Sequence, residues 1–368
     1  EDTGNLNVHS ASGKQLQSGI TIMDPYTGNI VAMVGAVGPK TQNLVDNYAV
    51  QKHQVGSSIK PLTVYSAALD AGAVTPATTF DNYPVHLLNG NPWPKNSPNT
   101  YTGWTMIGEG VRRSINTIAV QTLEALGVAD SYAYATEKLG LSLVPEDMGV
   151  APLAMGGLTY GLSTVEMAAA FSSFANSGVY NSPKMYTEVR DSSGEVVLKN
   201  EGETHAAMKE TTAYFMNQML TSVVNAGTGT SAKFSGMTIA GKTGTTNNDQ
   251  DRYFVGYTPY YSCAVWVGYV HNQRIVASGN PAASMWQKVM SRVHEGMEDK
   301  DFFSCSGLTY VSVCADSGLL ATENCAMDCR GSRVYSALVA ADNAPSASCN
   351  LHTSPDYTVA FVDENGET

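Results

Sequence analysis

The stretch QVGSSIKP, residues 54–61, is the part of the sequence on which the interpretation of this chain depends. Its S-x-x-K motif places Ser57 three residues before Lys60, so on a helix both side chains lie on one face. Serine is a weak nucleophile at neutral pH and needs a base beside it, and a buried lysine can lose its proton and become that base. No other serine in the sequence is followed by lysine at this spacing. A solvated pair on a helix surface is the alternative interpretation of the motif taken alone.

A second pair of polar residues, Ser114 and Asn116, lies within a segment of helical periodicity over residues 105–126, which Gly127 ends. Residues two apart on an ideal helix point about 200° apart, so both side chains face one cleft only if they lie in a loop or at a helix end. Chemically, Ser114 could relay a proton between Lys60 and a leaving group, and Asn116 could hold a substrate amide. Serine and asparagine are also common in caps and turns, so this pair indicates nothing by itself.

A third motif, KTGTT at residues 242–246, is predicted to lie on a strand. Positions 242, 244 and 246 then share one face, and positions 243 and 245 share the other. The glycine removes a side chain where another backbone or a ligand approaches closely. An edge strand can bind an extended peptide as an added strand, and the hydroxyls and lysine suit a terminal carboxylate. A β-branched edge strand protected by a lysine is the alternative, but it leaves the glycine among threonines unexplained.

Hydrophobic periodicity and turn residues predict the other elements of the chain. We expect strands at residues 21–23, 30–34, 238–243, 253–257 and 262–270, and helices at residues 57–71, 164–176, 208–226 and 285–297. Near residue 300 the composition shifts to Ser, Cys, Gly and Ala, which predicts a main domain over residues 1–300 and a Cys-rich extension over residues 301–368.

Composition excludes several classes of function. The 368 residues carry a formal charge of −12, which argues against a nucleic-acid partner because a basic stripe would be expected. No apolar run approaches the roughly 20 residues that span a bilayer, and the first residues have no signal-peptide pattern. We expect either a processed secreted protein or an ectodomain separated from its anchor.

The sequence contains no catalytic metal motif and no glycine-rich phosphate loop, so no metal and no cofactor are predicted for the reaction.

The six cysteines are unevenly placed. Cys263 lies in an apolar strand, whereas five cluster near the end of the chain: Cys305, Cys314, Cys325, Cys329 and Cys349. Such clustering favours disulfides and an extracytoplasmic location, although five is odd and leaves one thiol free unless Cys263 or another chain takes part. A less favoured alternative is a zinc site, because Cys325-x3-Cys329 with Cys349-x2-His352 offers four ligands in two close pairs.

Taken together, the three motifs resemble those of the transpeptidase domain of class A penicillin-binding proteins. The similarity extends over residues 16–297 and includes GTG at 227–229, FVGYTP at 254–259 and WVGY at 266–269. SGLLAT at 317–322 resembles an extension that some of these proteins carry. The resemblance implies an α+β fold, in which a central antiparallel sheet is sandwiched between helical layers and Ser57 lies at their junction.

The resemblance also implies roles for the motif residues. Ser57 would form an acyl-enzyme with the D-Ala-D-Ala end of a peptidoglycan stem peptide, or with a β-lactam antibiotic, and its backbone N–H would form the oxyanion hole with that of Thr245. The implied catalytic residues are Ser57, Lys60, Ser114, Asn116 and Lys242. The implied substrate-binding residues are Thr243, Gly244, Thr245 and Thr246.

Related activities remain open at this point. β-Lactamases of class A add a glutamate followed four positions later by asparagine, and no such pair lies between Ser114 and Lys242. We therefore expect slow deacylation, so that penicillin inhibits the protein. A DD-carboxypeptidase and a non-enzymatic β-lactam sensor remain as alternatives to a DD-transpeptidase. The resemblance further implies an upstream glycosyltransferase domain, a membrane anchor outside this chain, and a location on the outer face of the bacterial cytoplasmic membrane.

Overall fold

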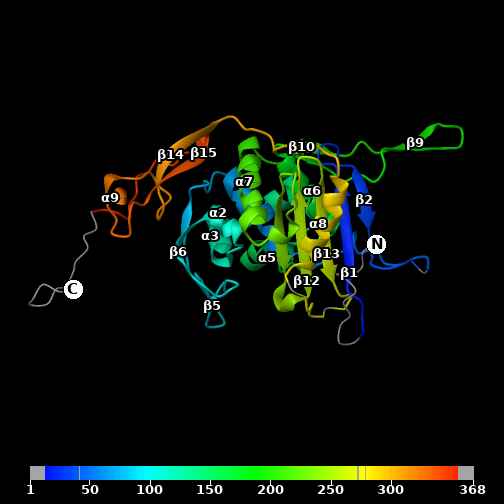
Figure 1. Ribbon diagram of the computed structural model, residues 1–368, viewed down its shortest axis with the longest axis horizontal. Coiled ribbons are helices and arrows are strands. Elements are labelled where there is room, and N and C mark those ends of the chain that lie inside the picture. Colours follow the sequence, from blue (N-terminus) through cyan, green and yellow to red (C-terminus); the bar gives the residue numbers. More distant parts are fainter. Residues whose placement is uncertain (1–12, 41, 272, 278, 355–368) are drawn as a thin grey trace, which may run out of the picture.

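A five-stranded antiparallel sheet forms the centre of the computed structural model, which describes residues 13–354 apart from 41, 272 and 278 (Figure 1). The spatial order is β11-β12-β13-β1-β2, so β11 is an edge strand, as the sequence predicts. Turns join the neighbours β1 and β2, and Thr258–Pro259 lies in the hairpin between β12 and β13. The strand bounds are β11 Ala240–Thr245, β12 Asp251–Tyr257, β13 Ser262–Gly268, β1 Gln17–Met23 and β2 Ile30–Val34.

The two faces of the sheet contribute to two separate hydrophobic cores. Strand residues alternate between the faces, so Val255 and Trp266 pack with α6 (Thr164–Ala175), whereas Phe254 and Val265 pack with α8 (Pro281–Val293). Full burial of each such side chain contributes roughly 1.5–3 kcal/mol. The predicted α+β sandwich is therefore confirmed, and Figure 1 shows helices on both sides of the sheet.

Most of the remaining helices contribute side chains to the first core. Their bounds are α1 Ser66–Asp70, α2 Ile107–Arg112, α3 Asn116–Leu126, α4 Val128–Ala133, α5 Val150–Met155 and α7 Glu210–Ala226, with shorter helical turns η3 Tyr134–Lys138, η4 Pro145–Asp147, η5 Thr230–Ala232, η6 Asn247–Asp249 and η7 Ala341–Asn343. Four two-stranded ribbons complete the main body: β3 Thr79–Asn82 with β6 Gly103–Met106, β4 His86–Leu88 with β5 Asn91–Trp93, β7 Val179–Asn181 with β10 Thr204–Ala206, and β8 Glu188–Arg190 with β9 Val196–Lys199. No helix in the described ranges is both long and apolar enough to cross a membrane.

Three predicted helices differ from the structure, and the last of them, expected at residues 285–297, lies four residues earlier as α8. The helix expected at residues 57–71 is present but changes type along its length: a 3₁₀ turn (η1, Gly56–Ile59), a π turn (η2, Pro61–Tyr65) and then α1. The single helix expected over residues 105–126 is wrong, because the chain breaks between α2 and α3 at the second motif.

The Cys-rich extension contains a hairpin of β14 (Leu308–Cys314) and β15 (Val334–Ala340), with the short helix α9 (Glu323–Ala326) beside it. Figure 1 shows this extension at one end of the molecule. Asn343 Nδ2 donates a hydrogen bond of 3.2 Å to the Val74 carbonyl and so joins the extension to the main body. All six cysteines are free, which contradicts the predicted disulfides.

Candidate active site

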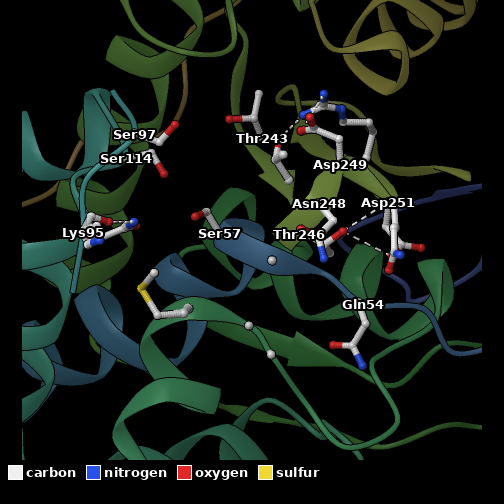
Figure 2. Close-up of a pocket in the computed structure, with 18 of the residues that line it drawn as sticks. Gln54, Ser57, Lys95, Ser97, Ser114, Thr243, Thr246, Asn248, Asp249 and Asp251 are labelled. Carbon is white, nitrogen blue, oxygen red and sulfur yellow. Dashed lines mark hydrogen bonds and ion pairs between the residues drawn. The ribbon is translucent and has the colours of Figure 1, made fainter. Parts of the chain in front are cut away.

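A groove between the helical region and the edge strand β11 contains the first motif (Figure 2). Ser57 lies on its floor and is half-buried. Figure 2 shows Ser114 and Lys95 on one side of Ser57, and Thr243 and Thr246 on the other. All three sequence motifs therefore meet at one groove, although they are far apart in the sequence.

Two glycines allow η1 and β11 to approach closely. A Cβ on Gly244 would lie 2.1 Å from the Val55 carbonyl oxygen. Gly56 has a φ of +51°, and a Cβ there would lie 2.4 Å from the Thr245 carbonyl oxygen. Gly244 thus faces the protein backbone, as one of the two options predicted for it, and Ser57 is held beside the edge strand because neither position carries a side chain.

The break between α2 and α3 positions Ser114. Its N–H donates to the Val111 carbonyl at 3.2 Å, and the N–H of Ile115 donates to the Gly110 carbonyl at 2.9 Å. This pair of bonds is the Schellman pattern, in which the residue after the helix adopts the left-handed conformation, and Ser114 has a φ of +59°. A serine in a position that usually favours glycine is a sparsely populated conformation, which is typical of functional sites.

Lys60 is fully buried and points toward the second motif. Its Nζ donates to the Ser114 carbonyl at 3.0 Å and to Asn116 Oδ1 at 2.6 Å. Burial, together with the positive charge of Lys242, lowers the pKa of Lys60 well below its usual value. The neutral amine that a general base requires is therefore favoured at this position.

Lys242 reaches the same serine from β11. Its Nζ donates to Ser114 Oγ at 2.8 Å and to its neighbouring Thr243 carbonyl at 3.2 Å. Burial lowers the pKa of Lys242 to about 7. The two lysines thus contact different atoms of Ser114, the carbonyl oxygen and the hydroxyl, which makes this residue the link between the first and third motifs.

Asn116 is the first residue of α3, a helix end as the predicted geometry requires. Its Oδ1 accepts from Lys60, and its Nδ2 donates to the Lys95 carbonyl at 2.7 Å. Asn96 Oδ1 accepts the N–H groups of Asn116 and Thr117 at 3.0 and 3.2 Å. Asn96 therefore satisfies free N–H groups at the start of the helix and fixes the direction of Asn116.

The threonines of the third motif have different surroundings. Thr243 and Thr245 line the groove; Thr243 shares a 2.7 Å hydrogen bond with Thr228 Oγ1, and Thr245 Oγ1 accepts from Arg252 Nη1 at 2.9 Å. The hydroxyl of Thr246 accepts the N–H of Asp251 at 2.9 Å and so supports the turn into β12.

Three further residues near the groove carry no role in the sequence-based prediction: Asn96, Thr228 and Arg252. Thr228 lies in the GTG segment, which the sequence comparison noted without assigning a function. Arg252 is opposite Thr245 in the strand register, so a correct pairing of β11 with β12 would have identified it. Its Nη2 pairs with Asp249 Oδ1 at 3.0 Å, and within the described residues its Nε is buried without a hydrogen-bond partner.

The groove contains no cluster of metal ligands among the residues described. Both clusters of three or more His, Cys, Asp or Glu side chains with converging ligand atoms lie in the extension instead. The chemistry that the groove offers is a serine hydroxyl with two lysines of lowered pKa, next to an edge strand with threonine hydroxyls.

Comparison with known proteins identifies the family. Residues 18–291 match the model of the penicillin-binding protein transpeptidase domain, and residues 304–354 match that of the penicillin-binding protein 1A C-terminal domain. The chain belongs to the penicillin-binding protein transpeptidase domain family. The resemblance stated from the three motifs is confirmed.

Relatives and solved structures agree with this assignment. Penicillin-binding protein 1A of Clostridium perfringens is 34% identical over 100% of this chain and 46% of its own length, and that of Clostridium botulinum is 33% identical over 94% and 43%. The chain thus spans less than half of these relatives. The crystal structure of penicillin-binding protein 1A from Haemophilus influenzae has the same fold, with a TM-score of 0.74 at 21% identity, covering 93% of this chain and 56% of that one.

Proposed function

We propose that this chain is a peptidoglycan DD-transpeptidase that cross-links stem peptides through an acyl-enzyme on Ser57. The observation that carries the proposal is the convergence of two buried lysines on Ser114 beside Ser57. Lys60 contacts the Ser114 carbonyl and Lys242 contacts its hydroxyl. Membership of the transpeptidase domain family supports the same reaction.

The proposed first step is acylation. Ser57 Oγ attacks the carbonyl carbon of the penultimate D-Ala while the Lys60 amine takes the hydroxyl proton. The bond to the terminal D-Ala then breaks, and Ser114 Oγ passes a proton to the leaving amine. The backbone N–H groups of Ser57 and Thr245 would stabilise the oxyanion. In the second step an amine of a neighbouring stem peptide attacks the ester, which forms the cross-link and returns the proton to Ser57.

Substrate binding is assigned to the edge strand and its lysine. Thr243 and Thr245 expose hydroxyls to the groove, and Lys242 supplies positive charge for the terminal carboxylate of a peptide or a β-lactam. Arg252, whose charge is paired with Asp249, holds the Thr245 hydroxyl in place. Gly244 would contribute through the close approach of β11 to η1, and Thr246 through the turn that it supports. Asn116 would orient the substrate amide by exchanging its bond to the Lys95 carbonyl for one to the substrate.

We also propose the location and the domain context. The relatives are named penicillin-binding protein 1A, and one similar structure, with a TM-score of 0.64, is the D,D-transpeptidase domain of a peptidoglycan glycosyltransferase from Eggerthella lenta. These names support a site of action on the outer face of the cytoplasmic membrane, with a membrane anchor and a glycosyltransferase domain in the full protein. The family matches over residues 18–291 and 304–354 support a transpeptidase domain over residues 1–300 followed by the extension over 301–368.

Labelling with a fluorescent penicillin tests the nucleophile. We expect covalent labelling of the wild-type chain and none of Ser57→Ala. Ser97→Ala is the matched control because this serine lines the same groove but has no lysine three residues later. Labelling of Ser57→Ala at the wild-type level would overturn the assignment.

Mass spectrometry of the products from stem peptides tests the fate of the acyl group. Cross-linked dimers in the presence of an acceptor amine are the expected result. Peptides shortened by one D-Ala without dimers would indicate a carboxypeptidase. Labelling by penicillin without any peptide product would indicate a sensor, and either of these outcomes would contradict the proposed transpeptidation.

A further inference from the structure

Four potential metal ligands converge in the extension from three separate segments. Cys314 ends β14, Cys325 lies in α9, and Cys349 and His352 lie in the segment after β15. Their three sulfur atoms and one ring nitrogen all lie within 4.8 Å of one another. The three cysteines are buried and the exposed fraction of His352 is 9%.

The distances within this cluster suit a tetrahedral zinc ion. Cys314 Sγ and Cys349 Sγ lie 3.4 and 3.5 Å from His352 Nδ1. Zinc–sulfur bonds of about 2.3 Å and zinc–nitrogen bonds of about 2.1 Å at the tetrahedral angle would separate sulfur and nitrogen by about 3.5 Å. A disulfide would use only two of the three sulfurs and leave the third beside the imidazole without a function. We propose that Cys314, Cys325, Cys349 and His352 bind one structural Zn²⁺.

The groups around the four ligands are arranged as an outer shell. His352 Nε2 lies 3.0 Å from Asp328 Oδ2, an interaction that directs Nδ1 toward the sulfurs. Backbone N–H groups of Asp316 and Thr322 donate to Cys314 Sγ at 3.4 Å and to Cys325 Sγ at 3.3 Å. Donors of this kind favour negatively charged sulfur.

Two carboxylates near His352 offer a second set of ligands, but arginines already engage them. Arg330 lies 2.6 Å from both Asp316 Oδ2 and Asp328 Oδ2, and Arg333 lies 2.6 Å from Asp316 Oδ1. Asp316 and Asp328 therefore belong to the outer shell, where they orient His352 and balance the arginines. The direct ligands are the three sulfurs and Nδ1.

The small core of the extension explains why a structural metal would stabilise it. The buried residues of the apolar cluster under its hairpin are Ala77, Val313, Ala337 and Val339, and those of the other cluster in the extension are the three cysteines. A unit with so small a core needs a cross-link or a metal to be stable. A site closed by four protein ligands holds the metal for structure, and no position remains open for catalysis. The sequence-based zinc alternative named Cys329, which is exposed, and the structure places Cys314 there instead.

Metal analysis of the purified chain tests this inference. The chain is purified under reducing conditions without chelator, and its zinc content is measured by inductively coupled plasma mass spectrometry. We expect one zinc per chain, and loss of that zinc in Cys325→Ser and in His352→Gln. Cys305→Ser and Cys329→Ser are matched controls that remove neighbouring cysteines outside the cluster and should retain the metal. Labelling by fluorescent penicillin establishes that each variant keeps a folded main domain.

Two further measurements distinguish a tetrahedral zinc site from a disulfide and from a site without metal. Cobalt exchanged into the wild-type chain should show thiolate-to-cobalt charge transfer and the strong visible bands of tetrahedral cobalt, and both should be lost in His352→Gln. Peptide mapping without reduction should find Cys314, Cys325 and Cys349 unpaired. A disulfide among these three, a metal-free wild-type chain, equal zinc in wild type and Cys325→Ser, or a different metal in the site would each overturn the proposal.

Discussion

At the scale of single residues, the groove depends on two lysines. Burial lowers the pKa of both amines, and the proposed reaction requires one of them to be neutral. A buried ammonium group without a carboxylate partner is unfavourable, and the oxygens that Lys60 and Lys242 contact belong to carbonyl, amide and hydroxyl groups. The protein therefore favours the neutral form of Lys60, which is the form that can accept a proton from Ser57.

Replacing Lys60 with arginine should abolish this base. A guanidinium group cannot lose its proton in a protein, so Lys60→Arg keeps the charge but removes the proton acceptor. We expect the rate of acylation by penicillin to fall by at least about 100-fold. The measurement is the time course of fluorescent-penicillin labelling. Lys52→Arg, on an exposed lysine, is the matched control and should react at the wild-type rate. Unchanged acylation in Lys60→Arg would mean that another group is the base.

The acylation rate should also depend on pH through both lysines. Lys60 acts when it is neutral, so the rate should fall as acid protonates it. Lys242 attracts the carboxylate when it is charged, and its pKa is about 7, so the rate should fall again as pH rises above neutrality. In Lys242→Arg the charge persists at alkaline pH, and the alkaline decline should disappear even if the maximum is lower. Stopped-flow acylation across the pH range measures both limbs, and an alkaline limb that persists in Lys242→Arg would contradict this role.

At the scale of elements, the sequence predicts the strands of the main sheet and the long helices well. It predicts the ends of helices and the short strands between them less well. The sequence predicts α6 and α7 to within about two residues because their periodicity is strong, and β2 because turn residues mark its start. The final helix begins at Pro281, four residues before the predicted start, although Asn280 as its cap and Pro281 as its first residue are recognisable start signals. The short strands between β3 and β6 carry no comparable pattern.

The break at Ser114 shows why the site was only partly predictable. The side chains of residues 105–126 have a continuous helical period, and the interruption arises from backbone bonds that end α2 and from Asn96, which is distant in sequence, at the start of α3. The three motifs could be identified because their residue types carry the chemistry. Asn96, Thr228 and Arg252 act through contacts that exist only in the folded chain.

The contact between η1 and β11 gives a prediction at this scale. In Gly244→Ala the new Cβ would lie 2.1 Å from the Val55 carbonyl oxygen, so η1 and β11 must separate. We expect a loss of about 1–3 kcal/mol in the free energy of unfolding, together with slower acylation. Gly108→Ala is the matched control, because Gly108 lies in α2 with no atom within 4 Å of the new Cβ. That control should be neutral or stabilising by up to about 1 kcal/mol. Urea unfolding and penicillin labelling report the two effects, and an equal response of both variants would refute the argument.

At the scale of the whole molecule, the main body and the extension are stabilised in different ways. The main body has two apolar cores on the faces of one sheet, whereas the extension has a hairpin and the cysteine cluster. Their contacts include apolar packing of Leu308, Leu338 and Ala340 against the main core, and hydrogen bonds such as that of 3.4 Å from Thr79 Oγ1 to the Ala315 carbonyl. These residues are not among those that line the groove, so loss of order in the extension should leave the groove intact.

Removal of the proposed zinc tests this independence. A chelator should release the segment between β14 and β15, because metal binding supplies folding free energy to such sites. Trypsin should then cut faster after Arg330 and Arg333, which in the folded extension pair with Asp316 and Asp328. Arg190, in the exposed ribbon of β8 and β9, serves as an internal reference whose cleavage should not change. Penicillin labelling of Ser57 should persist at the wild-type rate, and added zinc should restore protection. If labelling falls in step with cleavage, the extension supports the active site after all, and the two units are energetically coupled. If neither cleavage site responds to the chelator, the segment is held by its ion pairs and hairpin alone.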